Sequence, residues 1–250
     1  MSRLMLGSGA TANYLSRALP WIERVDRYSV GHNFFLCVDF DPPEELALRY
    51  PNVRFVRFDM AADRAPNPNF CLQHGSFLDA SGAEQDDVVV FTDGDAYLQR
   101  PFTEGEIAWL GGVPRDVVAL QWNAGLADNL FFEAQRIDPR TPLEEMDEVT
   151  LRVWEALPCY NTGVFVARGG TYRRVYAEYC RRHDAIVAAF GHYARQQWLL
   201  SYVVGVCGFS VWRLPVSFHA HGHYGMPEGC REEDGMILFR DEPVAFRHML

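Results

Sequence analysis

Asp93 and Asp95 are the residues whose spacing most clearly permits chemistry. They stand in VVVFTDGD, where an apolar run from Val88 to Phe91 precedes two carboxylates separated by one glycine. Alternate residues on an extended chain share a face, so both carboxylates can turn toward one ion. Two like charges this close are unfavourable without a cation, and hard oxygen ligands favour Mg²⁺ or Mn²⁺. Gly94 has no side chain to block a diphosphate approaching that ion. The motif predicts a divalent metal site, although Asp and Gly are also common in turns.

Three histidines near the C-terminal end form a second group of possible ligands. His219, His221 and His223 alternate in the segment HAHGH. On an extended segment they would face the same way and could bind a transition metal. They could equally line a substrate site or belong to a polar loop, and the spacing leaves all three possibilities open.

The charge balance excludes nucleic acid as a partner. The formal net charge is −10 in 250 residues and no basic run occurs, so DNA or RNA would be repelled. An acidic protein can still bind a nucleotide where a metal supplies local positive charge. All 23 basic residues are Arg. A basic side chain that contacts phosphate must therefore be Arg or His, and a lysine Schiff base is impossible.

Cysteine usage and hydropathy predict a cytoplasmic protein. The six cysteines are widely spaced without a CxxC pair, which is typical of buried thiols in a reducing compartment. The N-terminal residues lack the basic and apolar regions of a signal peptide. The longest apolar run, Tyr202 to Trp212, is broken by glycines and is too short to span a bilayer.

Strands alternate with helices along the chain, which predicts an α/β fold whose central, mostly parallel sheet is flanked by helices. The expected strands are Leu4–Gly7, Asn33–Phe40, Val53–Met60, Val88–Phe91, Asp116–Trp122 and Pro158–Gly169. The expected helices are Leu15–Val25, Pro42–Tyr50, Cys71–Ala80, Thr171–Phe190 and Gly191–Gly205. Three segments are expected outside these elements: a loop at Gly7–Tyr14, a surface excursion at Asp128–Asp147 and a tail with a closing hairpin from Pro215 onward. No linker divides the chain, so a single domain is expected.

Five segments together resemble the retaining glycosyltransferases of family 8, the glycogenin-like and bacterial galactosyltransferase-like group with the GT-A fold. VVVFTDGDAYLQRPFTEGE resembles the strand, DxD motif and second strand of that family. ATANY resembles its first loop, CYNTGVFVA its asparagine-containing strand, and RQQWLLSYV the segment beside the anomeric carbon. PVAFRHML places a histidine where the family has its third metal ligand. The resemblance spans most of the chain, but only the DxD motif and the Asn-Thr-Gly strand are specific.

The resemblance implies a metal-dependent transferase that moves a hexose from a nucleotide sugar, commonly UDP-linked, with retention of configuration. The metal ligands would be Asp93, Asp95 and His248, holding Mn²⁺ or Mg²⁺. The residues that bind the donor would be Ala10, Thr11, Asn13 and Tyr14 of the first loop, with Tyr14 against the base, together with Asp93, Gly94 and Asp95. The residues beside the sugar would be Gln197, supporting the anomeric carbon, Asn161, orienting a hydroxyl, and Gln196. Residues 1–125 would form the nucleotide-binding half and residues 126–250 the acceptor half with the closing tail.

The sequence also departs from the family. Gln196 stands where the family often has aspartate, and Trp198 replaces the next acidic residue. The family's Gly-x-x-Lys-Pro-Trp tail has no counterpart after His248, so no lysine reaches the diphosphate from there. Arg100 and Arg247 are the residues we consider as substitutes.

Each assigned residue has a simpler role as an alternative. Tyr14 could cap a helix, Asn161 could shape a turn and Gln197 could be solvated. His248 could be a surface histidine near a frayed end.

The acceptor could be a glycan, a lipid-linked sugar, a peptide or a small molecule. It is expected near Trp122, Asn123 and Asp128, which follow the strand after the DxD motif, or near the histidine cluster.

Three other functions remain as alternatives. An aspartate phosphohydrolase would place its Asp-x-Asp motif near the start of the chain and would need a downstream lysine, which this sequence lacks. A nucleotidyltransferase of related fold would carry an early Gly-rich basic loop, whereas GSGATANY has no basic residue. A non-catalytic nucleotide-sugar-binding protein would keep the fold without the reaction.

Overall fold

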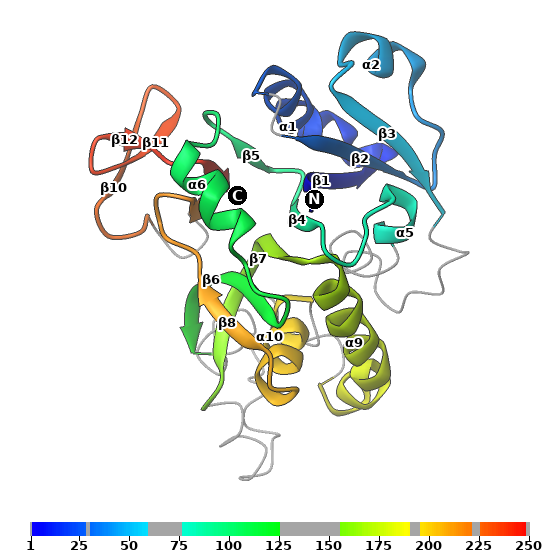
Figure 1. Ribbon diagram of the computed structural model, residues 1–250, viewed down its shortest axis with the longest axis vertical. Coiled ribbons are helices and arrows are strands. Elements are labelled where there is room, and N and C mark those ends of the chain that lie inside the picture. The colour runs from blue at the N-terminus through cyan, green and yellow to red at the C-terminus, as the bar shows by residue number, and fades with distance from the viewer. Residues whose placement is uncertain are drawn as a thin grey trace.

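A seven-stranded sheet forms the centre of the computed structural model (Figure 1). The structure describes residues 2–28, 31–59, 77–125, 156–190, 196–221 and 226–248, without the side chains of residues 77, 122–125, 183–190 and 196–199. The strands of the large sheet are β1 (Leu4–Thr11), β2 (His32–Val38), β3 (Val53–Phe58), β4 (Val88–Thr92), β6 (Val117–Gly125), β7 (Pro158–Arg168) and β8 (Ser210–Arg213). They lie in the order β3-β2-β1-β4-β7-β6-β8. The expected α/β fold is confirmed.

Most neighbouring strands of the large sheet run parallel, and β7 is the exception. It pairs antiparallel with β4 on one side and with β6 on the other. The start of β7 therefore lies beside the carboxyl ends of β4 and β6. This arrangement brings Asn161 opposite Gln121 and places Gly163 next to the residue that follows Thr92.

Helices cover both faces of the large sheet (Figure 1). They are α1 (Leu15–Tyr28), α2 (Glu44–Arg49), α5 (Phe77–Ser81), α6 (Glu104–Gly111), α9 (Gly169–Phe190) and α10 (Gln196–Val206). Alternate strand residues point to opposite faces, so each central strand contributes to two cores. In β2, Phe35 packs with Trp21 of α1, whereas Phe34 and Leu36 belong to the core beneath α9 and α10.

Two small sheets extend the large one. The first has the order β5-β13-β9 and consists of β5 (Ala96–Leu98), β13 (Phe246–His248) and β9 (His219–His221). The second consists of β10 (Cys230–Glu233), β11 (Met236–Phe239) and β12 (Glu242–Pro243), in which β10 and β11 form the expected hairpin. The first small sheet joins a strand just after β4 to the C-terminal segment. Stacked rings of Phe102 and Phe218, with Phe246 edge-on to both, anchor it to the core.

The structure corrects two boundaries of the sequence interpretation. Residues 7–11 are not a loop, because β1 continues to Thr11 and pairs there with Val38; only the 3₁₀ turn at Ala12–Tyr14 lies outside the sheet. The expected strand at 33–40 ends at Val38, since Asp39 has a φ of 58° and turns the chain, and the strand expected at 53–60 ends at Phe58. The helix expected at 71–80 is described only from Phe77, and the excursion at 128–147 lies outside the described residues.

Two further expectations concern membranes and thiols. None of the helices that the structure describes has the length and apolar character needed to cross a bilayer. The five cysteines that it describes are free thiols. Cys71 lies outside the described residues.

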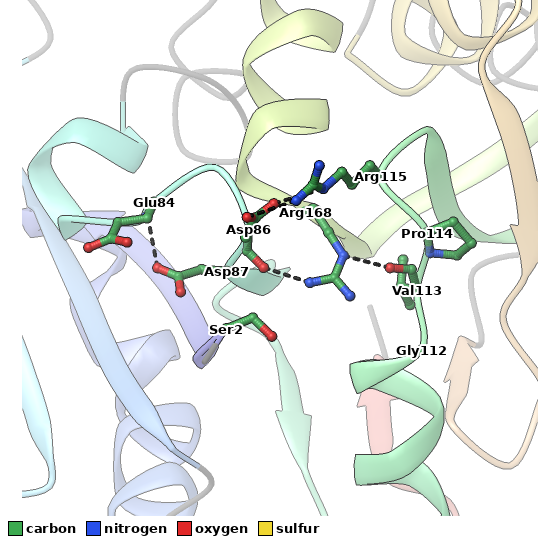
Figure 2. Close-up of a pocket in the computed structure, with 9 residues that line it drawn as sticks. All are labelled: Ser2, Glu84, Asp86, Asp87, Gly112, Val113, Pro114, Arg115 and Arg168. Atoms are coloured by element: carbon green, nitrogen blue, oxygen red, sulfur yellow. Dashed lines mark hydrogen bonds and ion pairs between the residues drawn. The ribbon is translucent and has the colours of Figure 1, made fainter.

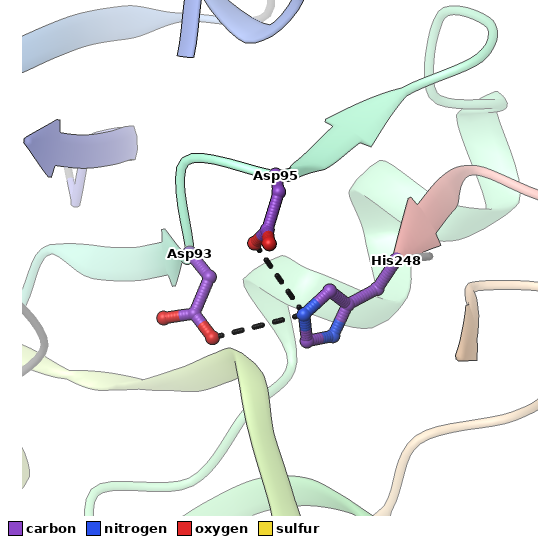
Figure 3. Close-up of side chains that lie close together, drawn as sticks. All are labelled: Asp93, Asp95 and His248. Atoms are coloured by element: carbon purple, nitrogen blue, oxygen red, sulfur yellow. Dashed lines mark ion pairs between the residues drawn. The ribbon is translucent and has the colours of Figure 1, made fainter. Parts of the chain in front are cut away.

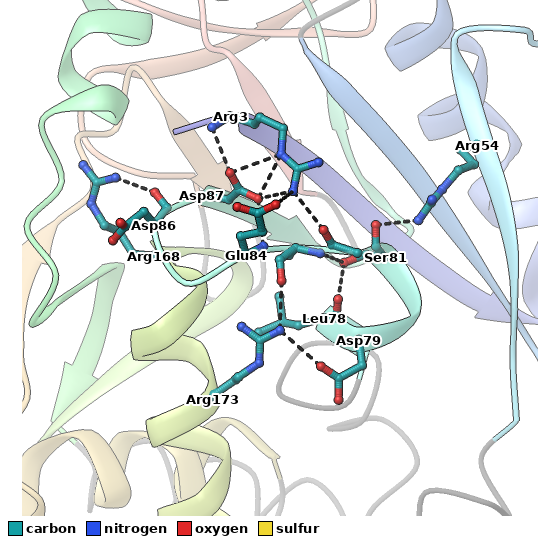
Figure 4. A network of polar contacts seen from close by, with 12 residues as sticks. Arg3, Arg54, Leu78, Asp79, Ser81, Glu84, Asp86, Asp87, Arg168 and Arg173 are labelled. Atoms are coloured by element: carbon teal, nitrogen blue, oxygen red, sulfur yellow. Dashed lines mark hydrogen bonds and ion pairs between the residues drawn. The ribbon is translucent and has the colours of Figure 1, made fainter. Parts of the chain in front are cut away.

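A network of polar contacts holds the end of the sheet at which the central strands β1 and β4 begin (Figure 4). The Arg3 guanidinium donates to both carboxylate oxygens of Asp87 at 2.5–3.2 Å, and the backbone N–H groups of Arg3 and Glu84 donate to the same carboxylate. Arg173 of α9 donates to Asp79 and to a backbone carbonyl near it. These bonds tie β1, β4, α5 and α9 together at the end of β4 opposite Asp93.

Candidate functional site

Asp93, Asp95 and His248 converge at the carboxyl end of β4 (Figure 3). His248 Nε2 lies 3.5 Å from Asp95 Oδ1 and 3.8 Å from Asp93 Oδ2. The two aspartates follow β4 directly, whereas His248 ends β13 and is aligned with Ala96 of β5. The small sheet thus carries a histidine from the end of the chain to the acidic motif. Among the described residues, these three form the one group with metal-ligand spacing.

The three side chains fit a divalent ion. Their ligand atoms all lie within 4.8 Å of one another. Ligands of an octahedral ion at about 2.1 Å are separated by about 3.0 Å when adjacent and about 4.2 Å when opposite. The distances of 3.5 and 3.8 Å from His248 Nε2 fall between these limits. Two carboxylates and one imidazole suit Mn²⁺ better than Mg²⁺, because Mg²⁺ prefers oxygen ligands.

The acidic turn is held from two sides. The backbone N–H of Asp93 donates to the carbonyl of Gly163 in β7 at 3.0 Å, and the N–H of Ala96 donates back to the carbonyl of Asp93 at 3.0 Å. Gly94 lies against α1, where an added Cβ would stand 3.2 Å from the Cβ of Ala18. The glycine between the aspartates therefore permits close packing on α1, beside the approach to the metal centre.

Buried hydrogen bonds fix the last residue of β4. The indole Nε1 of Trp21 in α1 donates to Thr92 Oγ1 at 2.7 Å, and Ser8 Oγ of β1 donates to the carbonyl of Thr92 at 2.9 Å. All three side chains are fully buried. Because Asp93 follows Thr92 directly, these bonds determine where the acidic motif leaves the sheet.

The ring of His248 is enclosed by two neighbours. It stacks on His219 with ring centroids 5.7 Å apart and an angle of 20° between the planes. On its other edge, a Cβ added to Gly163 would lie 2.1 Å from His248 Nδ1. Among the described residues, His248 Nδ1 and both ring nitrogens of His219 have no hydrogen-bond partner, and all three atoms are buried. Within this part of the chain, packing orients the imidazole of His248, whereas metal-binding histidines usually also donate a hydrogen bond.

The pKa values of the cluster reflect opposing effects. Burial disfavours the imidazolium form of His248, but its contact with Asp95 and the charges of both aspartates outweigh burial and raise its pKa. Burial likewise raises the pKa of Asp95, yet contact with His248, its own backbone N–H and the charge of Arg17 leave that pKa below the usual value. Complete burial, with repulsion from His248 and His221, lowers the pKa of His219 well below its usual value. His219 is therefore neutral at pH 7.

The Asn-Thr-Gly segment of β7 lies beside the group formed by Asp93, Asp95 and His248. Asn161 is buried, and its Oδ1 accepts a hydrogen bond from the N–H of Gly163 at 2.9 Å. This bond spans two residues and gives Asn161 the turn-like role that the sequence left open; its role beside a sugar stays a prediction. Gln121 lies opposite it in β6 and is buried, and its Oε1 has no hydrogen-bond partner among the described residues. Nothing in the sequence selects Gln121, because one amide within an apolar strand has no distinctive spacing.

The first loop presents an exposed aromatic ring near α1. Tyr14 ends the 3₁₀ turn, its side chain is 52% exposed, and the guanidinium carbon of Arg17 lies 5.4 Å from the centre of its ring. Thr11 donates through Oγ1 to Asn13 Oδ1 at 2.6 Å, which closes the turn. Ala10 is buried in β1. Tyr14 is therefore free to stack on a planar ligand, whereas Ala10 can contact one only through its backbone.

The two arginines considered as substitutes for the missing lysine are engaged elsewhere. Arg100 forms a two-pronged ion pair with Glu106 and also donates to the carbonyl of Pro243. Arg247 donates to the carbonyl of Gly235 and to Glu232. Both guanidinium groups thus bind the small sheet of β10, β11 and β12 rather than a ligand.

The structure leaves several predicted residues without a side-chain position. Gln196 and Gln197 open α10, as the sequence indicates, and Trp122 and Asn123 lie in β6, but the side chains of these four are outside the described set. Asp128 and His223 lie outside the described residues altogether. Their roles stay predictions. Of the histidine cluster, His219 and His221 lie in β9, and neither belongs to the group with metal-ligand spacing.

The sequence matches no protein-family model and no curated protein, whereas solved structures of similar fold are known. The galactosyltransferase LgtC, in complex with donor and acceptor sugar analogues, aligns over 98% of this chain and 87% of its own, with a TM-score of 0.58 and 14% identity. Mouse xyloside xylosyltransferase 1, in its apo form, aligns over 99% and 97%, with a TM-score of 0.52 and 13% identity. The bifunctional glycosyltransferase WbbM aligns over 88% and 40%, with a TM-score of 0.54 and 16% identity.

The protein has the GT-A glycosyltransferase fold. At these identities the likeness establishes the fold, and the chemistry must be argued from the site. In a GT-A sheet, as in other open α/β sheets, ligands are expected at the carboxyl ends of the parallel strands, where Asp93 and Asp95 stand.

A hollow lies at the end of β4 opposite Asp93 (Figure 2). It has a volume of about 640 Å³ and is lined by Asp86, Asp87, Arg115 and Arg168 among others. Its charged groups already have partners: Arg168 donates to the carbonyls of Asp86, Gly111 and Val113, and Arg115 pairs with Asp86. A hollow whose polar groups are satisfied within the protein gives no reason to propose catalysis there.

Proposed function

We propose that this protein is a metal-dependent glycosyltransferase that moves a hexose from a nucleotide sugar, with UDP as the carrier, to an acceptor hydroxyl with retention of configuration. The convergence of Asp93, Asp95 and His248 at the carboxyl end of β4 carries the proposal. The alternatives lack such support, since neither a phosphohydrolase nor a nucleotidyltransferase explains a histidine brought to the acidic motif from the end of the chain.

The protein residues would act by holding and orienting the donor. Asp93, Asp95 and His248 would bind Mn²⁺ or Mg²⁺, which stabilises a leaving diphosphate as a Lewis acid. Tyr14, exposed beside α1, would stack on the base. Asn161 keeps its amide Nδ2 for a sugar hydroxyl, because its Oδ1 already accepts from Gly163. Gln197, with Gln196 beside it, would face the anomeric carbon. These two roles rest on the family resemblance, as does retention.

The two halves of the chain would have different tasks in this proposal. Residues 1–125 carry Tyr14 and the acidic motif and would bind the nucleotide. Residues 126–250 would form the acceptor side, with the C-terminal strand closing over the metal. The free thiols of the described cysteines agree with action in a reducing compartment such as the cytoplasm.

The first test is isothermal titration of UDP with and without Mn²⁺ on the wild type, on Asp95→Ala and on Asp41→Ala. Asp41 is a matched control, because its carboxylate is 87% exposed and pairs with Arg57 on the surface. We expect metal-dependent binding that Asp95→Ala weakens at least about 100-fold, because a metal contributes several kcal/mol to such a site. Asp41→Ala should bind like the wild type.

Three further results would decide the remaining claims. Absence of UDP binding under both conditions would remove UDP from the proposal, and GDP would be tried next. Release of UDP from UDP-hexoses in the presence of Mn²⁺ would separate an enzyme from a non-catalytic binder. The anomeric configuration of a transferred sugar, followed by NMR, would show retention or inversion.

A further inference from the structure

The proposed donor site has a charge imbalance. Asp93 and Asp95 contribute two negative charges, which a divalent ion cancels, and a metal-binding His248 is neutral. A sugar diphosphate brings two further negative charges, and another develops on the phosphate oxygen as the bond to the sugar breaks. Preorganised positive charge near that oxygen would lower the barrier. Because the chain has no lysine, this charge must come from an arginine or a histidine.

Arg17 lies where such a cation is needed. It stands in the first turn of α1, next to Ala18, the residue that packs against Gly94 between the two aspartates. Its guanidinium carbon lies over the ring of Tyr14, 5.4 Å from the ring centre. The guanidinium therefore lies at the ring of Tyr14, on a helix whose next residue packs against the acidic turn.

Arg17 also has free hydrogen-bond donors. It is exposed and lies over the Tyr14 ring, and within the described part of the chain its guanidinium makes no hydrogen bond or ion pair. Arg24, two turns along the same helix, already donates to the carbonyl of Leu98 and lies over Tyr97. Arg100 and Arg247 already form ion pairs, Arg100 with Glu106 and Arg247 with Glu232. Unlike these three arginines, Arg17 can therefore bind a ligand without breaking a hydrogen bond or an ion pair to a described residue.

We propose that Arg17 binds the diphosphate of the nucleotide-sugar donor and stabilises the nucleoside diphosphate as it leaves. The assignment rests on the proposed function of the metal centre. Its planar guanidinium can donate two parallel hydrogen bonds to phosphate oxygens. In the transfer, the bond between the anomeric carbon and the phosphate oxygen breaks, and its electron pair remains on that oxygen, within reach of the charge of Arg17. The acceptor oxygen bonds to the anomeric carbon, and its proton passes to the departing diphosphate.

The test measures binding of inorganic pyrophosphate, UDP and uridine at saturating Mn²⁺ to the wild type, Arg17→Gln, Arg17→Lys and Arg27→Gln. Arg27 is a matched control on α1, exposed and likewise beside a tyrosine ring, Tyr28, at 5.9 Å. We expect Arg17→Gln to weaken pyrophosphate and UDP about 10- to 100-fold, the range for a hydrogen-bonded charge, and to leave uridine unchanged. Arg17→Lys should lie between, since it keeps the charge without the fork. Arg27→Gln should match the wild type.

The outcomes separate this inference from the proposed function. Equal affinity of the wild type and Arg17→Gln for pyrophosphate would overturn the role of Arg17 while leaving the metal site intact. A loss of uridine binding equal to the loss of UDP binding would also overturn it, because Arg17 would then only support Tyr14. A wild type that binds neither pyrophosphate nor UDP with Mn²⁺ would overturn the proposed function together with this inference. Pyrophosphate has no base, so the result does not depend on whether the donor carries uridine.

Discussion

The imidazole of His248 lies directly against the Cα of Gly163. An added Cβ at position 163 would meet His248 Nδ1 at 2.1 Å and Cε1 at 2.2 Å. Real Cβ atoms do not approach other atoms so closely, so one of the two residues would have to move. Gly163 also accepts the backbone hydrogen bond from Asp93. One small residue of β7 thus sets the position of two proposed metal ligands.

Gly163→Ala should therefore impair metal binding more than folding. The methyl group would push His248 away from the two aspartates, and the affinity for Mn²⁺ should fall at least about tenfold, the cost of losing a group that orients a metal ligand. Titration with Mn²⁺ would measure the affinity, and circular dichroism would confirm the fold. Gly111→Ala is the matched control, because its Cβ would meet nothing within 4 Å. Unchanged Mn²⁺ affinity in Gly163→Ala would contradict the assignment of His248 as a ligand.

The contrast between Asp93 and Gly163 shows what the sequence could predict. The two aspartates share one face of a short segment after an apolar strand, so their spacing alone indicated a site. The pattern of strands and helices likewise indicated the α/β fold. The position of Gly163 under His248 depends on the antiparallel pairing of β7 with β4, and no local pattern encodes that pairing. A tertiary contact between residues 85 positions apart cannot be derived from either segment alone.

Arg17 illustrates a second limit of sequence interpretation. It stands three residues after Tyr14, the spacing at which side chains at the start of a helix meet, so the pair could have been noticed. The position of Arg17 near Asp95 could not have been predicted from the sequence, because it depends on the packing of Gly94 against Ala18. Arg100 and Arg247 attracted attention by their position near the motif and near the chain end. The structure shows that acidic partners already hold both.

Tyr14→Ala should weaken binding of the whole nucleotide. Stacking of a base on an aromatic ring contributes about 1–3 kcal/mol, so the affinity for UDP should fall about 5- to 150-fold. Tyr14→Phe keeps the ring and should bind UDP nearly as well as the wild type. Because Tyr14 is exposed, neither change should alter thermal stability. Titration of UDP at saturating Mn²⁺ would measure both variants, and equal binding by Tyr14→Ala would remove Tyr14 from the donor site.

Thr92→Val should destabilise the protein by leaving the indole N–H of Trp21 buried without an acceptor. The expected loss is about 1–3 kcal/mol in the free energy of unfolding. The bond joins α1 to the last residue of β4, so metal affinity should also fall modestly. A double-mutant cycle with Trp21→Phe provides the control. The loss caused by Thr92→Val should be much smaller in the Trp21→Phe background, and equal losses in both backgrounds would show that this hydrogen bond contributes nothing.

Asp87, at the end of β4 opposite Asp93, should make the free energy of unfolding depend on pH. Burial raises its pKa, but hydrogen bonds from the Arg3 side chain and from the N–H groups of Glu84 and Arg3 outweigh burial and leave the pKa below its usual value (Figure 4). A carboxylate whose pKa is lower in the folded state stabilises the fold above its unfolded pKa of about 3.9. That contribution is lost as the pH falls through the folded pKa.

Asp87→Asn should consequently cost about 2 kcal/mol of unfolding free energy at pH 7, since it weakens bonds between a buried carboxylate and an arginine. The difference from the wild type should stay constant between pH 5 and pH 7 and shrink below about pH 4, where the carboxylate of the unfolded chain takes up a proton before that of the folded protein does. Urea unfolding across this range would measure it. Asp79→Asn is the control, because its pair with Arg173 is 80% exposed at the aspartate and should contribute little. A difference for Asp87→Asn that persists undiminished at pH 3 would show that shape, and not charge, is what Asp87 contributes.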